Sequence, residues 1–471
     1  MGTLLPDSAE PICFLQGEYI EMEQKLTKKY GLFTAMAMVV GIVVGSGVFF
    51  KAEKILTATG GNLPLGILAW LIGGAIMIVC AYNFAVMATK YEYVNGIVDY
   101  AEVTMGKSYG YYVGWFLAMV YYPTLTSVLA WISARYTCVL LGFDITSGEC
   151  LAIAAFFLCA SYAVNALSPV LAGKFQVATT IIKLIPLFLM GIVGTIAGLA
   201  NGMTVQNFTT VVEEVPAGNA LLTAVVATSF AYEGWIIATS INAELKDAKK
   251  NLPRALVGGT AIIVLVYIVY YVGLAGAVTN AILMESGEAG AKLAFTEIFS
   301  TVGGTALMVF VVISCLGTLN GLMLGCTRGL YAIAVRNRGP KPETFSQVDR
   351  QTNMPHNSAV FGMLLCGFWL MYFFGANLST GWFGPFCFDS SELPIVTIYA
   401  AYIPIFIMFM KKETDLGAFK RFVMPILGIA GACFMVYAAF VSHGMAVWFY
   451  LIIFAVVMII GAAFNKEQKQ K

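Results

Sequence analysis

Twelve stretches of about twenty apolar residues recur along the chain, each separated from the next by a short polar segment. A helix of this length spans the hydrocarbon core of a bilayer, which is about 30 Å thick. Only 11% of the residues are charged, whereas about a quarter are charged in a typical soluble domain. The sequence therefore predicts an all-α polytopic membrane protein with about twelve transmembrane helices. The stretches cover residues 31–53, 65–89, 109–142, 149–167, 170–200, 219–244, 253–279, 303–335, 357–375, 391–410, 421–442 and 445–464.

The polar segments are too short for a separate soluble domain, and the longest covers residues 336–356. Residues 1–30 contain no apolar core of a secretory signal, and we expect them to form a cytoplasmic N-terminal segment. Within this segment Met22 opens a stretch typical of a natural start. We interpret residues 1–21 as an extension without a structural role.

The basic residues are distributed unevenly between the two sets of loops. If the N-terminus is cytoplasmic, 22 of the 27 Lys and Arg residues fall on the cytoplasmic side. The opposite loops hold only Lys51, Lys54 and Lys292. Cytoplasmic loops of membrane proteins are enriched in Lys and Arg, so both termini are predicted to be cytoplasmic.

The composition argues against several other functions. A net charge of +1 does not provide the dense basic surface that nucleic acids require. The ten cysteines form no CxxC pair, and no histidines stand at metal-ligand spacing, so we expect no metal and no cofactor. A nucleophile with a base and an orienting group is also missing, so an enzyme is not expected.

Two of the predicted spans contain helix-breaking sequences near their middle. The first span reads GIVVGSGVF from Gly41 to Phe49, and the sixth reads FAYEGW from Phe230 to Trp235. Gly41 and Gly45 also fit close helix packing of the small-xxx-small kind. Three consecutive small residues in the first span instead lower helix stability without forming one face. We therefore predict that both helices are broken.

The positions of the two breaks favour a substrate site. Spans one and six are equivalent positions in two halves of five helices, a pattern typical of transporters that bind substrate at the bilayer midplane. The amides that open the second half of a broken helix suit a carboxylate. The carbonyls that close the first half suit an ammonium group. Two such breaks together predict a receptor for a zwitterion such as an α-amino acid.

With these two motifs and a cytoplasmic run from Glu244 to Arg254 (ELKDAKKNLPR), the chain resembles the APC superfamily of amino-acid transporters. Within it, the sequence is most similar to the L-type amino-acid transporter family, especially its bacterial serine/threonine and alanine/serine/cysteine exchangers. The resemblance extends from about Lys25 to about Phe464.

This resemblance implies a leucine-transporter-like fold in which residues 31–200 and 201–410 form two inverted five-helix repeats. Residues 411–471 would then hold helices 11 and 12 and a cytoplasmic tail. It also implies that the substrate carboxylate meets amides near Ser46 and Gly47, that the amine meets carbonyls of the two breaks, and that Phe230 gates the site. The predicted substrate-binding residues are Val43, Val44, Gly45, Ser46, Gly47, Phe230, Ala231, Tyr232 and Glu233.

Lys183 lies well inside the fifth span. A charged residue at this depth costs at least about 2.5 kcal/mol, so it needs a partner or a role. The family has a lysine here whose ammonium occupies the place of an ion in sodium-coupled relatives, which implies sodium-independent exchange. The expected neighbours are the Gly45 carbonyl, Ser314 in span eight and Tyr267 in span seven, with Tyr270 and Tyr271 as alternatives to Tyr267.

Glu233 leaves the substrate class partly open. A carboxylate at mid-membrane can be protonated, bind a cation or face a water-filled vestibule. The family has an acid here in carriers of both neutral and cationic amino acids. We expect exchange of small neutral amino acids, with a proton-coupled symporter or a carrier of cationic amino acids or polyamines as alternatives. A channel is a further class, but it would need a continuous polar lining.

Animal members of the family are joined by a disulfide to a heavy chain through a cysteine between spans three and four. Here that loop ends at Cys150, which lacks the family's proline-rich surroundings. Cys138 flanks the same loop, and we do not expect the two cysteines to pair. We therefore expect no obligatory heavy chain and a location in a bacterial cytoplasmic membrane.

Overall fold

The computed structural model of the chain describes residues 31–91, 96–236, 245–287, 289–349, 351–352, 354–377 and 381–465. Every regular element in these ranges is a helix, as the apolar stretches predict. Ten helical segments are long and apolar enough to cross a membrane, and two shorter apolar helices lie at the predicted first and sixth spans. The protein is thus a multi-pass helical membrane protein. The predicted N-terminal segment at residues 1–30 and the end of the tail lie outside the described residues.

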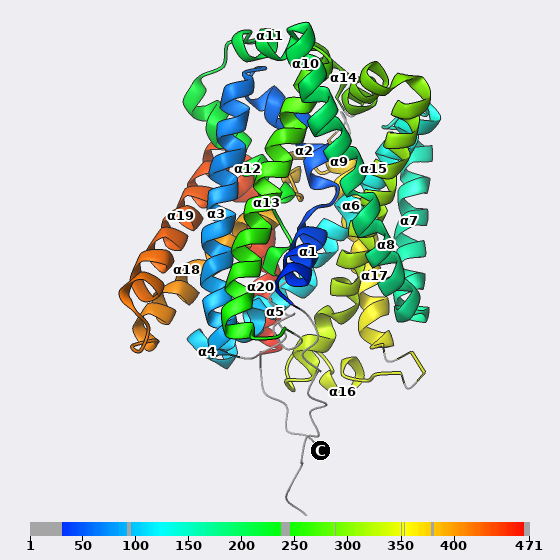
Figure 1. Cartoon of the computed structure of the whole chain (residues 1–471). Coiled ribbons are helices and arrows are strands. Elements are labelled where there is room, and N and C mark those ends of the chain that lie inside the picture. Colours follow the sequence, from blue (N-terminus) through cyan, green and yellow to red (C-terminus); the bar gives the residue numbers. More distant parts are fainter. Residues whose placement is uncertain are drawn as a thin grey trace, which may run out of the picture.

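The helices stand side by side as a bundle, with short helices at both ends (Figure 1). The membrane-crossing elements are α1 (Leu32–Val43), α2 (Gly47–Ala58), α3 (Leu63–Lys90), α5 (Lys107–Phe116), η1 (Leu117–Tyr121), α6 (Tyr122–Leu141), α7 (Gly148–Leu167), α8 (Pro169–Ile182), α9 (Leu184–Leu189), η2 (Met190–Gly194), α10 (Thr195–Asn201), α12 (Ala217–Ala231), α13 (Ala248–Ala277), α15 (Ala289–Ala334), α17 (His356–Asn377), α18 (Leu393–Lys412), η5 (Phe419–Val423), α19 (Met424–His443) and α20 (Met445–Ala463). The short connecting elements are α4 (Ile97–Met105), α11 (Met203–Thr209), α14 (Asn280–Ser286), α16 (Pro342–Phe345) and η4 (Gly384–Phe386).

Both predicted helix breaks are present. Helix α1 ends at Val43, the next three residues are not helical, and α2 begins at Gly47. Helix α12 ends at Ala231 and is followed by a turn in which Gly234 adopts a φ of +103°, a conformation that favours glycine. The sequence therefore located both interruptions. Glycine lowers helix stability, and each motif carries glycine at the point where its helix ends.

The fifth and seventh spans approach each other closely through glycines. A Cβ atom on Gly273 of α13 would lie 2.2 Å from the Met190 carbonyl oxygen, and one on Gly276 would lie 2.2 Å from the Gly194 carbonyl oxygen. Small residues let membrane helices make such backbone contacts, which replace the hydrophobic driving force that lipid does not provide. This contact fixes the segment that carries Lys183 against α13.

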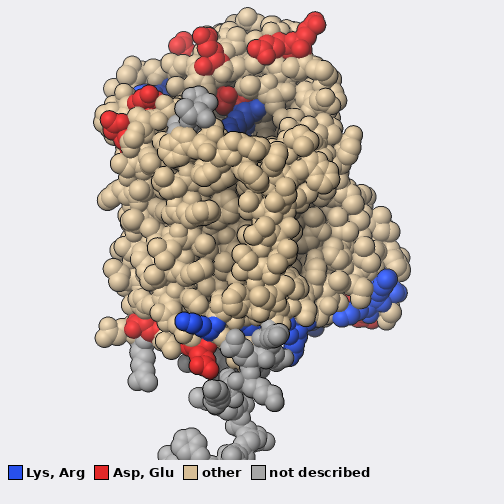
Figure 2. Space-filling model, turned by 180° about the vertical axis from the view of Figure 1, so that it is seen from behind, with Lys and Arg blue, Asp and Glu red and all other residues tan. Residues whose placement is uncertain are grey.

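The charged residues separate between the two ends of the bundle. Figure 2 shows Lys and Arg gathered mainly at the lower end, where Figure 1 places α4 and α16, and Asp and Glu dominating the upper end. We name these the basic end and the acidic end. The basic end matches the set of loops that the sequence predicts to be cytoplasmic, although Lys25, Lys28 and Lys29 lie outside the described residues.

We predict that Gly273→Ala destabilises the protein, whereas Gly367→Ala in α17 does not. The first methyl group would collide with the Met190 backbone, and overpacking of this kind costs about 1–3 kcal/mol. The second has no heavy atom within 4 Å and adds helix propensity. Thermal unfolding of the purified variants in detergent measures the difference. Equal melting temperatures would contradict the proposed role of the close contact.

Candidate functional site

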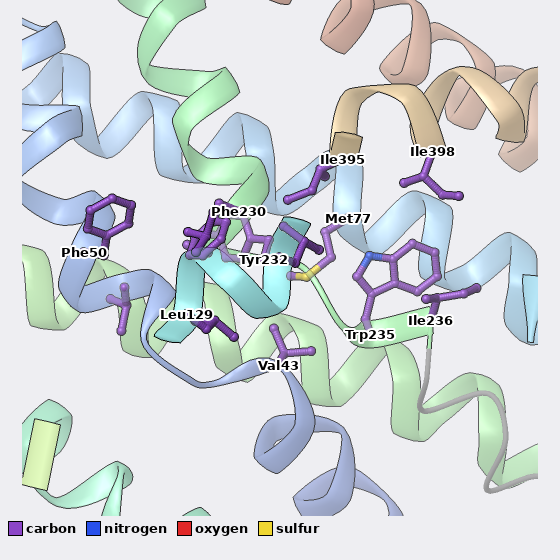
Figure 3. Close-up of a cluster of buried hydrophobic side chains, with 14 of the residues drawn as sticks. Val43, Phe50, Met77, Leu129, Phe230, Tyr232, Trp235, Ile236, Ile395 and Ile398 are labelled. Atoms are coloured by element: carbon purple, nitrogen blue, oxygen red, sulfur yellow. The ribbon is translucent and has the colours of Figure 1, made fainter. Parts of the chain in front are cut away.

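The two helix breaks enclose a cavity of about 230 Å³ in the middle of the bundle. Six of the nine predicted binding residues line it: Val43, Gly45, Ser46, Gly47, Phe230 and Glu233. Figure 3 shows Val43, Leu129 and Phe230 around the extended segment that joins α1 to α2. The remaining lining residues are Ile97, Leu117, Tyr121, Tyr122, Leu125, Leu129, Gln176, Gly234, Ile236, Thr318, Gly321, Leu322, Leu324 and Ile398.

The other three predicted residues lie behind the cavity wall. Val44 is fully buried. The Ala231 backbone packs so closely on Gly47 that a Cβ atom there would lie 2.5 Å from the Ala231 Cα atom. Tyr232 stacks on Tyr267 at 5.4 Å, and its hydroxyl donates to a backbone carbonyl of α3. These residues hold the two broken helices together and do not face the cavity.

The helix ends at the cavity have complementary partial charges. Ser46 is the N-cap of α2, yet its side chain makes no capping hydrogen bond, and its buried Oγ atom has no partner among the described residues. The first amides of α2 are therefore free of a protein cap at the cavity wall. The carboxyl ends of α1 and α12 bring partial negative charge to the same place. This arrangement suits a ligand with one carboxylate and one ammonium group.

Lys183 is fully buried, and its Nζ atom donates to the Gly41 carbonyl oxygen. The sequence placed this contact at Gly45, one helical turn further on. The structure differs because α1 ends at Val43, so the Gly41 carbonyl loses the amide of Gly45 that would have bonded to it in a continuous helix. The ammonium group thus satisfies a carbonyl that the break itself releases.

Among the described residues, no hydrogen bond joins Ser314 of span eight to Lys183, its predicted neighbour. Its Oγ atom is buried and makes no hydrogen bond among the described residues. Thr318, one turn further along α15, instead approaches Gly45, where a Cβ atom would lie 2.3 Å from the threonine Oγ1 atom. Thr318 is thus a residue of span eight near the break that the sequence analysis missed.

Tyr267 connects the two broken helices. Its hydroxyl lies 3.1 Å from the Ala231 carbonyl oxygen and 3.4 Å from the Val43 carbonyl oxygen. Both acceptors are in the last turn of a helix that stops at the cavity. Among the three tyrosines that the sequence left as alternatives, Tyr267 is the one whose hydroxyl lies at the carbonyls of the two breaks, and these carbonyls are its partners instead of the predicted Lys183.

Glu233 lies at the cavity with one oxygen satisfied. Its Oε1 atom accepts a hydrogen bond from the Tyr121 hydroxyl, and its buried Oε2 atom has no partner among the described residues.

The sequence analysis missed Tyr121 and Gln176. Gln176 could have been predicted from the sequence, because it precedes Lys183 by seven residues and therefore lies on the same face of the helix. Tyr121 could not, because its direction depends on the π-helical turn η1.

A second cavity of about 270 Å³ continues the first one. The two share seven lining residues, and the second also includes Val98 of α4 and Arg328 near the end of α15. These elements lie at the basic end (Figure 1). The site is therefore connected to the basic end, while Phe50 and Phe230 pack edge to face at 5.9 Å on its other side. Within the described residues, no group of three metal-ligating side chains is present.

Comparison with known proteins gives a consistent result. A family model described as amino acid permease matches residues 30–463. The serine/threonine exchanger SteT of Bacillus subtilis is 29% identical over 429 residues, which cover 89% of this chain and 93% of that protein. The human large neutral amino acids transporter small subunit 2 is 27% identical, over 70% of this chain and 62% of that protein. The mouse Asc-type amino acid transporter 1 is 27% identical with the same coverage.

We predict that Tyr267→Phe lowers the stability of the protein by about 1 kcal/mol, because the hydroxyl that donates to the Ala231 carbonyl and also lies near the Val43 carbonyl is lost. Tyr270→Phe is the matched control, since that hydroxyl is equally buried and makes no hydrogen bond among the described residues. Melting temperatures of the two variants test the assignment. A larger loss for Tyr270→Phe would show that the wrong tyrosine had been chosen.

Proposed function

The chain belongs to the amino acid permease family, and we propose that it exchanges small neutral L-amino acids across the membrane by alternating access. The observation that carries this proposal is the cavity where the uncapped start of α2 meets the ends of α1 and α12. The α2 amides would receive the substrate carboxylate, and the carbonyl ends of α1 and α12 would receive its ammonium group. The Bacillus subtilis relative is a serine/threonine exchanger, which also favours exchange over net uptake.

The size and lining of the cavity favour small substrates. The part between the two breaks has a volume of about 230 Å³, which lies below the 300–1,000 Å³ usual for sites of drug-sized ligands, and the second cavity continues it toward the basic end. Most of the side chains that line it are apolar, and the unpartnered oxygen of Glu233 can accept a hydrogen bond from a substrate hydroxyl. Serine, threonine and alanine are the substrates that we propose. Cationic amino acids are an alternative that competition experiments can distinguish.

Sodium independence is proposed from the position of Lys183. A bound alkali cation would need oxygen ligands such as the carbonyls that a helix break releases. The Lys183 ammonium group already donates to the Gly41 carbonyl oxygen. This positive charge takes the place that a bound cation would have beside the released carbonyl. Proton coupling is the second candidate, because the buried carboxyl group of Glu233 is able to exchange a proton.

We further propose that the basic end is cytoplasmic, that residues 31–200 and 201–410 form the two inverted repeats, and that residues 411–471 are an appended pair of helices with a tail. We propose that no second subunit is required, whereas the human relative is named a small subunit. Cys150, at the end of the loop between spans three and four, is fully buried. Its thiol is therefore not available at the surface for a disulfide with another chain.

Counterflow in proteoliposomes tests the proposed transport. Radiolabelled serine uptake in sodium-free buffer should rise strongly when the vesicles contain unlabelled serine, and external alanine or threonine should compete. Uptake that requires sodium would contradict the role proposed for Lys183. Uptake that requires an inward proton gradient and ignores internal serine would favour the symporter. Competition by arginine alone would move the substrate class to cationic amino acids.

We predict that Lys183→Gln lowers the counterflow rate at least about tenfold, since a buried hydrogen bond from a charged group is worth about 1.5–3 kcal/mol. Lys174→Gln is the matched control, because Lys174 lies on the same helix with an exposed side chain. Equal rates for both variants, measured with equal amounts of folded protein in the vesicles, would remove Lys183 from the mechanism.

A further inference from the structure

A buried ion pair lies on the acidic side of the cavity, apart from the groups used so far. The Lys51 side chain in α2 is 0% exposed, and its Nζ atom lies 2.5 Å from Glu392 Oε1 and 3.2 Å from Ser391 Oγ. Glu392 is the N-cap of α18 and is 5% exposed. The pair therefore joins the second half of the broken first helix to the start of α18.

Two further groups complete the cluster. His443, the last residue of α19, places its Nε2 atom 3.0 Å from Glu392 Oε2. Asp389 accepts hydrogen bonds from the backbone amides of Ser391 and Glu392, and its charge also acts on Lys51 and His443. We name Lys51, Asp389, Glu392 and His443 the outer latch. It connects α2, the segment before α18 and the end of α19.

The outer latch lies directly above the roof of the cavity. The Lys51 Nζ atom is 5.0 Å from the ring centroid of Phe50 and 5.2 Å from that of Phe230. Phe230 itself lines the cavity. Movement of α2 away from α18 would open the cavity toward the acidic end and would separate Lys51 from Glu392. Separating a buried pair costs more than keeping it, unless water reaches both charges.

We propose that Lys51, Glu392 and His443 form the outer gate of the transport path, and that a proton on His443 holds this gate closed. The inference rests on the proposed transport function, and it adds the residues that control access from the acidic end. The charged groups that face the imidazole are Glu392 and Asp389, which attract its cation, and Lys51, which repels it.

The direction of the pH effect follows from which group can titrate. Burial alone would raise the pKa of Asp389 and of Glu392, but the Lys51 ammonium lowers both pKa values below their ordinary range. These carboxylates therefore stay ionised in mild acid. An imidazole has an ordinary pKa near 6.5, so within the outer latch the proton taken up between about pH 8 and pH 5.5 goes to His443. The closed gate binds this proton, and a rise in pH on the acidic side favours opening.

Counterflow with the external pH varied and the internal pH fixed tests the proton. The protein must be inserted with its acidic end outside, and labelled serine is the probe. The wild-type rate should rise about fivefold from pH 5.5 to pH 8, a typical coupling for a two-state equilibrium. His443→Gln should remove this dependence. His356→Gln is the matched control, because His356 is the other histidine of the chain and pairs with Asp349 at the basic end.

The ion pair is tested by the substrate KM measured from each side. Glu392→Gln should favour the open outer gate, so the external KM falls and the internal KM rises, since the two states share one population. Lys51→Glu combined with Glu392→Lys should restore the wild-type ratio of the two values. A purely structural role would not move the two KM values in opposite directions. If Glu392→Gln fails to fold, the pH profile of His443→Gln still tests whether the gate depends on a proton.

The outcomes separate the two proposals. A wild-type protein without counterflow would overturn the proposed function. Counterflow that is independent of external pH, or a dependence that persists in His443→Gln, would overturn the proton-dependent gate while leaving transport intact. KM values that move in parallel from both sides would remove Lys51 and Glu392 from gating.

Discussion

Hydrogen bonding of the backbone inside a bilayer is the constraint on which this structure depends. Lipid offers no partners, so each helix interruption leaves amides and carbonyls that the protein or a ligand must satisfy. The chain interrupts two helices at one depth and supplies only part of the missing partners. Lys183 bonds to the Gly41 carbonyl, and Tyr267 bridges the ends of α1 and α12. The first amides of α2 have no side-chain cap from Ser46, and the proposed function assigns them to the substrate carboxylate.

The same groups link binding to movement. α2 carries the free amides at its start and Lys51 one turn later. One short helix thus takes part in both the proposed substrate site and the outer latch, and the two lie within one turn of each other. The close packing of Gly47 on the Ala231 backbone couples the two breaks in the same way. On another side, the glycine contacts hold α13 against the segment that follows Lys183.

Sequence reasoning identified this region with good accuracy but not the partners of each side chain. The breaks near Gly45 and Gly234 followed from local helix propensity, which a sequence contains. The acceptor of Lys183 was placed one turn too far along α1, and Thr318, which approaches Gly45, was missed. Both errors concern the register between helices. Register is set by side-chain packing over the whole interface, which no single motif records.

The sequence by itself determined the helical membrane fold, the uneven distribution of charge and the two broken spans, because each depends on local composition and periodicity. Only the tertiary structure decided which six predicted residues face the cavity, which tyrosine bridges the breaks, and that the site communicates with the basic end. It alone revealed the outer latch, whose members Lys51, Glu392 and His443 lie hundreds of residues apart or on different helices. These residues come together only when the helices pack. Membrane helices are apolar on most faces, so their packing is set by specific contacts between them, which local sequence does not contain.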